Sequence, residues 1–118
     1  MIFFRGFVKT KNKKSTMPFK DVSSDQLLTK EEADELPEYA GVLADDTILI
    51  DVDDQEQAEK LLNIVDDQQL RCRVYRTTHG KHFVFLNLDE NGNPLCETCK
   101  TKKPLAVGII ADIKVGHR

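Results

Sequence analysis

Two aspartates, Asp51 and Asp53, end an apolar run in the sequence Thr-Ile-Leu-Ile-Asp-Val-Asp-Asp of residues 47–54. Because alternate residues of a β-strand share a face and lie about 7 Å apart, the two carboxylates would point in the same direction. Hard divalent cations such as Mg²⁺ and Mn²⁺ prefer carboxylate oxygens, water and phosphates as ligands. The spacing therefore predicts a metal site where this strand ends.

Two further polar residues stand in strand-like surroundings downstream. Asp112 lies late in the apolar stretch 107–113, and His82 opens the apolar stretch 82–86. Three carboxylates and an imidazole on adjacent strands suit phosphoryl transfer, in which two divalent ions activate a 3′-hydroxyl and stabilise the leaving pyrophosphate.

Each of these residues also has a purely structural interpretation. Asp53 or Asp54 could cap a following helix, although capping would not explain Asp51. Asp112 could be an exposed acid at the end of a strand, and His82 could be a hydrogen-bonded packing residue.

The turn that precedes His82 holds groups that favour phosphate. Residues 77–81 read Thr-Thr-His-Gly-Lys, so Thr78, Gly80 and Lys81 place a hydroxyl, a glycine and a cation beside the imidazole. Glycine lets the backbone approach a phosphate closely, and the amide, imidazole and ammonium groups together could hold a triphosphate. We expect His79 to be an exposed turn residue.

The elements that must position these groups follow from hydrophobic periodicity. A helix is predicted after Asp54, because its apolar positions recur at the spacing of one helix face. An antiparallel hairpin is predicted for residues 70–77 and 82–88, and a turn for residues 89–94. The lysine-rich stretch 100–104 is expected to be a connection to the last strand. The fold class is therefore α+β, with one mixed sheet that carries helices on one face and leaves the other face for chemistry.

Residues 1–40 form a basic N-terminal arm plus a helix. One short strand is predicted before the basic turn, and a helix that starts near residue 25 or 30 and ends at Pro37. All six basic residues of the arm precede the first acid, Asp21, and they are Arg5, Lys9, Lys11, Lys13, Lys14 and Lys20. Such an arm can track a phosphate backbone, so Lys11, Lys13 and Lys14 are predicted to bind single-stranded DNA. The alternative is a solvated tail.

Composition limits the remaining possibilities. A chain of 118 residues, 40% of them hydrophobic, forms one compact domain, and no apolar run approaches the length that spans a membrane. With no secretory segment, we expect a cytoplasmic protein whose three cysteines are reduced. Cys96 and Cys99 have the spacing of half a zinc site, with His79, His117 or Cys72 as further ligands. The alternative is a reduced cysteine pair in a surface connection.

Taken together, the strand with Asp51-Val52-Asp53, the turn with Gly80-Lys81-His82 and the final Ala111-Asp112 resemble the three motifs of the archaeo-eukaryotic primase superfamily. The similarity is to the primase-polymerase domains of phages and plasmids and covers residues 41–116. One departure is His79, which stands where many relatives carry a first glycine.

The resemblance implies a truncated catalytic core related to RNA-recognition (RRM-like) folds, spanning residues 41–118. It implies that Asp51, Asp53 and Asp112 hold two Mg²⁺ or Mn²⁺ ions and that His82 contacts the phosphates of a nucleoside triphosphate. Lys81 and Lys114 match positions that would contact phosphate. It also implies primer synthesis on a single-stranded DNA template, beside a helicase domain or replication initiator on a longer chain from a mobile element in a bacterial host.

Two other interpretations remain open at this point. One is a non-catalytic nucleic-acid-binding domain that assists replication and keeps the primase fold. The other is a small acidic domain whose aspartates are helix caps or an incidental calcium site.

Overall fold

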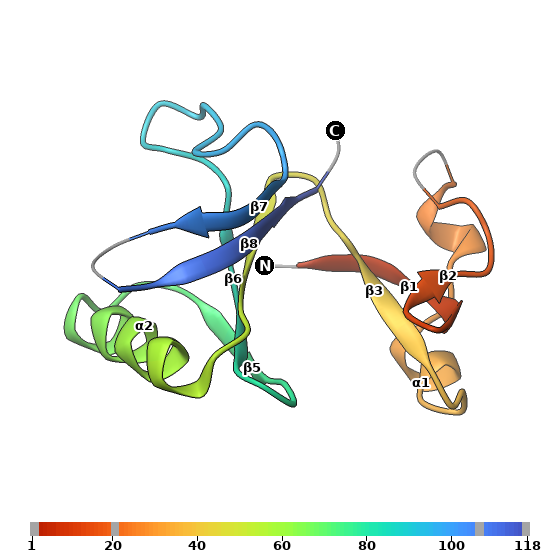
Figure 1. Ribbon diagram of the computed structural model, residues 1–118. Coiled ribbons are helices and arrows are strands. Elements are labelled where there is room, and N and C mark those ends of the chain that lie inside the picture. The colour runs from red at the N-terminus through yellow and green to blue at the C-terminus, as the bar shows by residue number, and fades with distance from the viewer. Residues whose placement is uncertain (1–2, 20–21, 106–107, 117–118) are drawn as a thin grey trace. The chain divides into compact units, whose positions relative to one another are not determined.

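The strand that carries Asp51 is the middle strand of a five-stranded sheet. The computed structural model describes residues 3–19, 22–105 and 108–116, and β4 spans Thr47–Val52 as predicted. The strand order is β5-β6-β4-β8-β7 (Figure 1). The flanking strands are β5 at Arg73–Arg76, β6 at Lys81–Leu86, β7 at Lys100–Pro104 and β8 at Ile110–Val115.

All strand pairs among the described residues are antiparallel, so the expectation of one mixed sheet was wrong. The reason lies in the crossover after β4. The helix does return the chain so that β5 runs in the same direction as β4, but β6 inserts between them and pairs with both. The hairpin of β5 and β6 was predicted correctly.

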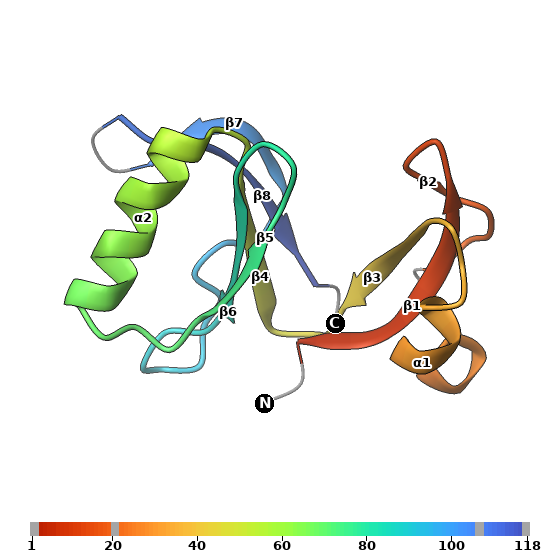
Figure 2. The ribbon, with the colours of Figure 1, turned by 90° about the horizontal axis from the view of Figure 1, so that it is seen from below.

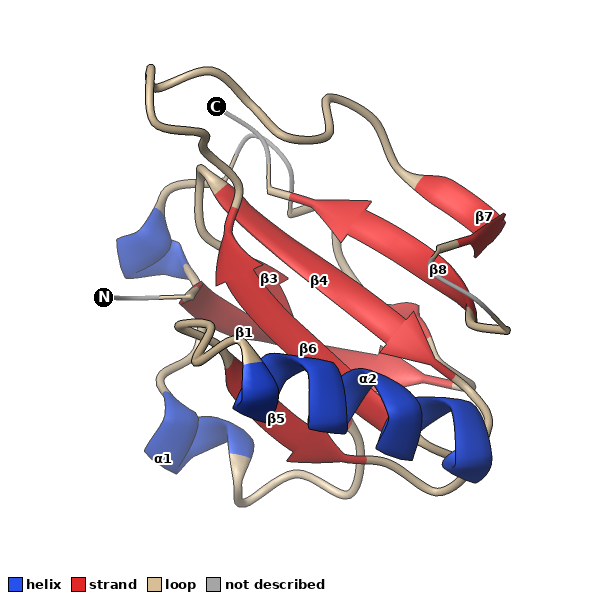
Figure 3. Ribbon diagram, turned by 90° about the vertical axis from the view of Figure 1, so that its left-hand side faces the viewer, coloured by secondary structure: helices blue, strands red, loops and turns tan. Residues whose placement is uncertain are grey.

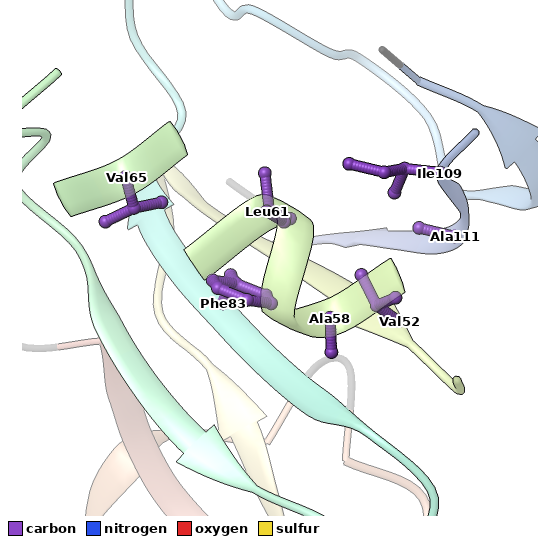
Figure 4. Close-up of a cluster of buried hydrophobic side chains, with 7 residues drawn as sticks. All are labelled: Val52, Ala58, Leu61, Val65, Phe83, Ile109 and Ala111. Atoms are coloured by element: carbon purple, nitrogen blue, oxygen red, sulfur yellow. The ribbon is translucent and has the colours of Figure 1, made fainter. Parts of the chain in front are cut away.

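Helix α2, at Gln55–Asp67, covers one face of this sheet (Figure 3). It begins at Asp54, whose side chain accepts a hydrogen bond from the Gln57 amide at 2.9 Å, as expected of an N-cap. The apolar stripe of the helix packs against β4, β6 and the start of β8 (Figure 4). The buried side chains of this core are Val52, Ala58, Leu61, Val65, Phe83, Ile109 and Ala111.

Residues before Asp46 form a second, three-stranded sheet of order β2-β1-β3. Its strands are β1 at Phe4–Lys11, β2 at Lys14–Ser15 and β3 at Tyr39–Leu43. The basic stretch is thus largely a β-hairpin, whose turn residues Asn12 and Lys13 have φ of 53° and 68°. Lys20 lies outside the described residues.

A small core and a capped helix complete this part of the chain. Val8, Leu27 and Val42 form the core, and a Cβ on Gly6 would lie 2.4 Å from the Leu27 side chain, so only glycine fits there. A 3₁₀ turn at Ser24–Gln26 precedes helix α1, Lys30–Ala33, which begins with the capping box of Thr29 and Glu32. The single helix predicted to start near residue 25 or 30 and to end at Pro37 is therefore a 3₁₀ turn followed by a short helix that ends at Ala33.

The chain divides into two compact units. The first unit contains residues up to Asp45 together with Gly116, and the second unit is Asp46–Val115 (Figure 2). Within the second unit, Ile48 near the start of β4 pairs with Val115 at the end of β8. No helix in the described part of the chain is long and apolar enough to cross a membrane.

Of the predictions for two segments near the C-terminal end, one is confirmed and the other is wrong. The turn predicted at 89–94 is present, with the Asp89 carboxylate accepting hydrogen bonds from the amides of Asn91 and Asn93. The lysine-rich stretch expected to be a connection is instead strand β7, at the edge of the sheet. The predicted last strand at 107–113 is observed as β8 at Ile110–Val115, and residues 106–107 lie outside the described residues.

Candidate acidic site on the central strand

A row of polar side chains runs across the five-stranded sheet at the level of Asp51. Asp51 is the register partner of His82 on β6 and of Asp112 on β8, and His82 is the partner of Tyr75 on β5. Directly opposed residues in an antiparallel sheet point to the same face, with Cβ atoms about 5 Å apart. The structure therefore brings Tyr75, His82, Asp51 and Asp112 onto one face, which we call the acidic row.

The acidic row lies on the face opposite α2. Val52 and Phe83, the neighbours of Asp51 and His82 along the chain, are buried in the α2 core, so alternation turns Asp51 and His82 to the other side. The Nε2 atom of His82 lies 3.4 Å from Oδ1 of Asp51, and their side chains keep exposed fractions of 34% and 24%. Both groups can therefore reach a ligand from solvent.

Asp112 is held by the neighbouring edge strand. Its Oδ1 accepts a hydrogen bond of 2.8 Å from the backbone amide of Lys102. Lys102 has a φ of 48° and lies where the register of β7 against β8 shifts, between Lys100 and Lys103. A bulge of this kind redirects a backbone group, and here it leaves the second oxygen of Asp112 for another partner.

Asp53 and Asp54 are adjacent in the sequence but have different surroundings. Asp54 caps α2, which resolves which of the two aspartates serves the helix. Asp53 is exposed and lies one residue past the end of β4, two positions after Asp51. It is thus the only one of the three predicted metal-binding carboxylates that lies outside a strand.

The acidic row suits a hard cation by chemistry, although it is not a preformed cage. Like charges directly opposite one another destabilise a sheet, and Asp51 and Asp112 are opposed, so a cation between them would relieve repulsion. Within the described ranges, no group of three or more His, Cys, Asp or Glu side chains is arranged to hold a metal ion. Mg²⁺ is commonly held by one or two carboxylates, with water and substrate phosphates completing its shell, and the pair Asp51 and Asp112 fits that pattern.

The turn before His82 is shaped by contacts with the end of β4. Gly80 is buried, and a Cβ at this position would lie 1.8 Å from the carbonyl oxygen of Val52. The Gly80 amide donates to Oγ1 of Thr77, and the Thr77 amide donates to the Gly80 carbonyl. The glycine is therefore required for close backbone packing, whatever its relation to phosphate.

The other predicted phosphate-binding groups of this turn lie elsewhere. Lys81 alternates with His82 and so points toward α2, where its Nζ lies 3.1 Å from Oε1 of Glu59. The carbonyl of Thr78 accepts a hydrogen bond from the Gln55 side chain at 3.5 Å. His79 is exposed, as expected. The turn is thus joined to the start of α2, while His82 alone belongs to the acidic row.

Cations do flank the acidic row on its own face. Lys114 is exposed and lies two residues after Asp112 on β8, opposite Leu49. Arg73 lies two residues before Tyr75 on β5, opposite Val84. Sequence reasoning found Lys114 but missed Arg73 and Tyr75, because only the strand pairing shows that β5 adjoins the strand of His82.

The predicted DNA-binding lysines lie in the first unit. Lys11, Lys13 and Lys14 are exposed on the hairpin of β1 and β2. The Lys13 amide donates to Oε2 of Glu38 at 2.8 Å. These lysines therefore belong to an ordered hairpin and not to a free tail, with their charges directed to solvent.

The cysteines form no cluster among the described residues. Cys72, Cys96 and Cys99 are free thiols, and His117, one of the proposed further ligands, lies outside the described residues. Burial raises the pKa of the Cys72 thiol to about 11. The Asn87 side chain bonds both the amide and the carbonyl of Cys96, at 2.9 and 2.7 Å, which anchors the loop that carries Cys96 and Cys99.

Comparison of the chain with models of protein families, with curated proteins and with solved structures finds no significant match.

Proposed function

We propose that this chain is a primase-polymerase domain of a phage or plasmid replication protein, which joins nucleotides on a single-stranded DNA template. The observation that carries the proposal is the acidic row. Asp51, His82 and Asp112, which come from three separate sequence motifs, are register neighbours on three adjacent strands of one sheet.

The strand order supports the same proposal. Helix α2 connects β4 to β5, and β6 lies between these two strands, which is a split β-α-β arrangement. RRM-like sheets share this arrangement and use the face opposite their helices for ligands. In the second unit that face carries the acidic row.

In the proposed reaction, the chain's own residues bind and orient the substrates. Asp51 and Asp112 would hold Mg²⁺ or Mn²⁺, and Asp53, which follows β4, would be the third carboxylate ligand. The bound ions would supply Lewis acidity to the attacking 3′-hydroxyl and the leaving pyrophosphate. The imidazole of His82 would contact the triphosphate, and Lys114 would add a positive charge on the same face. A helicase domain or replication initiator is the expected partner.

The proposal is tested by titrating Mn²⁺ in the presence and absence of a nucleoside triphosphate. We expect nucleotide-dependent Mn²⁺ binding to the intact chain, and its loss in Asp51→Asn and in Asp112→Asn. Asp66→Asn, which removes the same charge from an exposed position on α2, is the matched control and should bind as the intact chain does. Equal Mn²⁺ binding by all four proteins would contradict the proposal.

A second candidate is a non-catalytic nucleic-acid-binding domain with the same sheet. The observation that favours it is the lack of a three-group metal cluster among the described residues. This candidate predicts DNA binding that Asp51→Asn and Asp112→Asn leave unchanged, together with no nucleotide-dependent Mn²⁺ binding. Primer extension on a single-stranded template then separates the two candidates directly.

A further inference from the structure

Strand β7 forms a positively charged edge beside the acidic row. It is the outermost strand of its sheet and pairs only with β8. All five of its residues are exposed, and three of them are lysines, with no acid in the strand. We call the set of Lys100, Lys102 and Lys103 the lysine edge.

The lysine edge is connected to the proposed catalytic carboxylate. Lys100 pairs with Ile113 and Lys103 with Ala111, so Asp112 lies on β8 between the two pairs. The Lys102 amide donates to Asp112. Since neighbouring strands lie about 4.8 Å apart, a ligand along β7 would lie next to the acidic row.

Further positive charge extends the edge on both sides of the sheet. Lys114 is exposed on β8 on the face of the acidic row. On the other side, the ammonium of Lys60 from α2 lies by Gly108, where an added Cβ would come within 3.3 Å of it. Lys114 on β8 and Lys60 beside Gly108 thus add positive charge to the β7–β8 hairpin, which carries the lysine edge.

We propose that the lysine edge binds the phosphate backbone of a single-stranded nucleic acid and guides that strand past the acidic row. Charge complementarity selects this occupant, because closely spaced cations release condensed counterions when they neutralise successive phosphates. The identity of the strand as template or primer rests on the proposed function. The binding itself is measured without nucleotide or metal, so the two proposals can fail separately.

Lysines at sheet edges also have a general protective role. They prevent an exposed edge from pairing with the edge of another molecule. That role alone predicts that removing the charges leaves nucleic-acid affinity unchanged and causes self-association that grows with concentration. The two accounts therefore differ in a measurable way.

The test uses the full chain and a fluorescently labelled oligodeoxythymidylate, with the dissociation constant measured across a range of salt concentrations. The variant Lys100→Gln, Lys102→Gln, Lys103→Gln should bind on the order of tenfold more weakly at low salt, and its salt slope should fall by about 2, given a slope near 0.7 per phosphate contact. Replacing the same three residues by arginine should restore binding.

The matched control is Lys9→Gln, Arg71→Gln, Arg76→Gln, which removes three exposed positive charges that belong neither to the lysine edge nor to the predicted DNA-binding lysines of the hairpin. Binding that weakens clearly more in the edge variant than in this control supports the proposal. Equal weakening would assign binding to net charge and overturn it. Unchanged affinity of the edge variant, with or without self-association, would also overturn it, as would no binding by the intact chain. Nucleotide-dependent Mn²⁺ binding in the edge variant reports on the proposed function independently.

Discussion

The two units of the chain differ in how much apolar surface supports their sheets. In the second unit, Phe83, Ile109 and Val52 are at most 2% exposed beneath α2. In the first unit, the core consists of Val8, Leu27 and Val42, with Phe19 and Val22 partly buried against it. Because a site needs rigid support to hold its geometry, the second unit offers the proposed site the better supported sheet.

The polar groups of the two units also differ in their arrangement. In the first unit, one lysine is held in a closed local network: Lys30 lies between Asp34 and the Tyr39 hydroxyl, at 2.5 and 2.6 Å, and its ammonium lies 4.9 Å from the Tyr39 ring centre. In the second unit, two carboxylates are opposed across β4 and β8. A surface that leaves like charges together suits a ligand of opposite charge, whereas a closed local network suits stability.

The largest expected effect tests the core of the second unit. Phe83→Ala should lower the free energy of unfolding by about 3–5 kcal/mol, because it leaves a cavity between β6 and α2. Leu86→Ala on the same strand is the control, since Leu86 is 40% exposed, and its cost should be well below that. Denaturant unfolding followed by circular dichroism gives both values. Equal costs would contradict the burial of Phe83 beneath α2.

The next effect concerns the backbone contact behind His82. Gly80→Ala should cost about 1–3 kcal/mol through overpacking, because its Cβ would meet the Val52 carbonyl at 1.8 Å. Gly92→Ala is the comparison: nothing lies within 4 Å of the added Cβ, and only its φ of 82° opposes the change. Thermal unfolding measures both, and nucleotide-dependent Mn²⁺ binding should fall in Gly80→Ala only.

The helix caps allow the two units to be perturbed by similar amounts. Thr29→Ala in the first unit and Asp54→Ala in the second should each cost about 1 kcal/mol. Asp53→Ala is the matched control for Asp54→Ala, since Asp53 caps nothing, and it should change stability by less than about 0.5 kcal/mol. We expect Asp53→Ala to weaken Mn²⁺ binding all the same. The reverse pattern for the two aspartates would contradict the assignment of Asp54 as the cap.

The smallest effect is a pH dependence of the first unit. A hydrogen bond from Thr10, followed by one from the Lys13 amide, lowers the pKa of Glu38, and a hydrogen bond from Lys30 lowers that of Asp34. A carboxyl whose folded pKa is lowered adds stability above its unfolded value, here near 4.5 for Glu38, and this stability is lost as the pH falls through the folded pKa. Because both groups are exposed, salt should weaken the effect.

This pH dependence can be observed in the first unit alone. The chain has two tyrosines and no tryptophan, and Tyr75→Phe leaves Tyr39 of the first unit as the only tyrosine reporter. Its fluorescence should report lower stability at pH 3 than at pH 6, with a smaller difference in Glu38→Gln. The same difference in both proteins would assign the pH effect to other carboxyls.

Sequence periodicity predicted the local elements of the second unit well. The run at 47–52 is apolar, the stripe of α2 recurs at helical spacing, and the β5–β6 hairpin joins two runs close in sequence, so the local residue pattern indicates all three. Strand β7 was missed because its residues are all exposed, which removes the alternation that indicates a strand. Its pairing with β8 depends on backbone hydrogen bonds instead.

The candidate site was predictable by residue type but not in its detailed arrangement. Asp51, His82 and Asp112 were selected from motifs, and the structure brings them together through strand pairing. The pairing of Lys81 with Glu59 and the position of Tyr75 depend on which strands adjoin. Membership of β3 in the first sheet depends likewise on its pairing with β1. Such long-range choices leave little trace in local periodicity.

The pairing of Ile48 with Val115 has a practical consequence for engineering. The chain enters and leaves the second unit at neighbouring points on adjacent strands, as it does in a domain that is inserted into another protein. Residues 46–115 could therefore be transplanted as a cassette into a surface loop of an unrelated carrier protein. Joining the ends with a short linker would also permit new termini at the turn near Gly92.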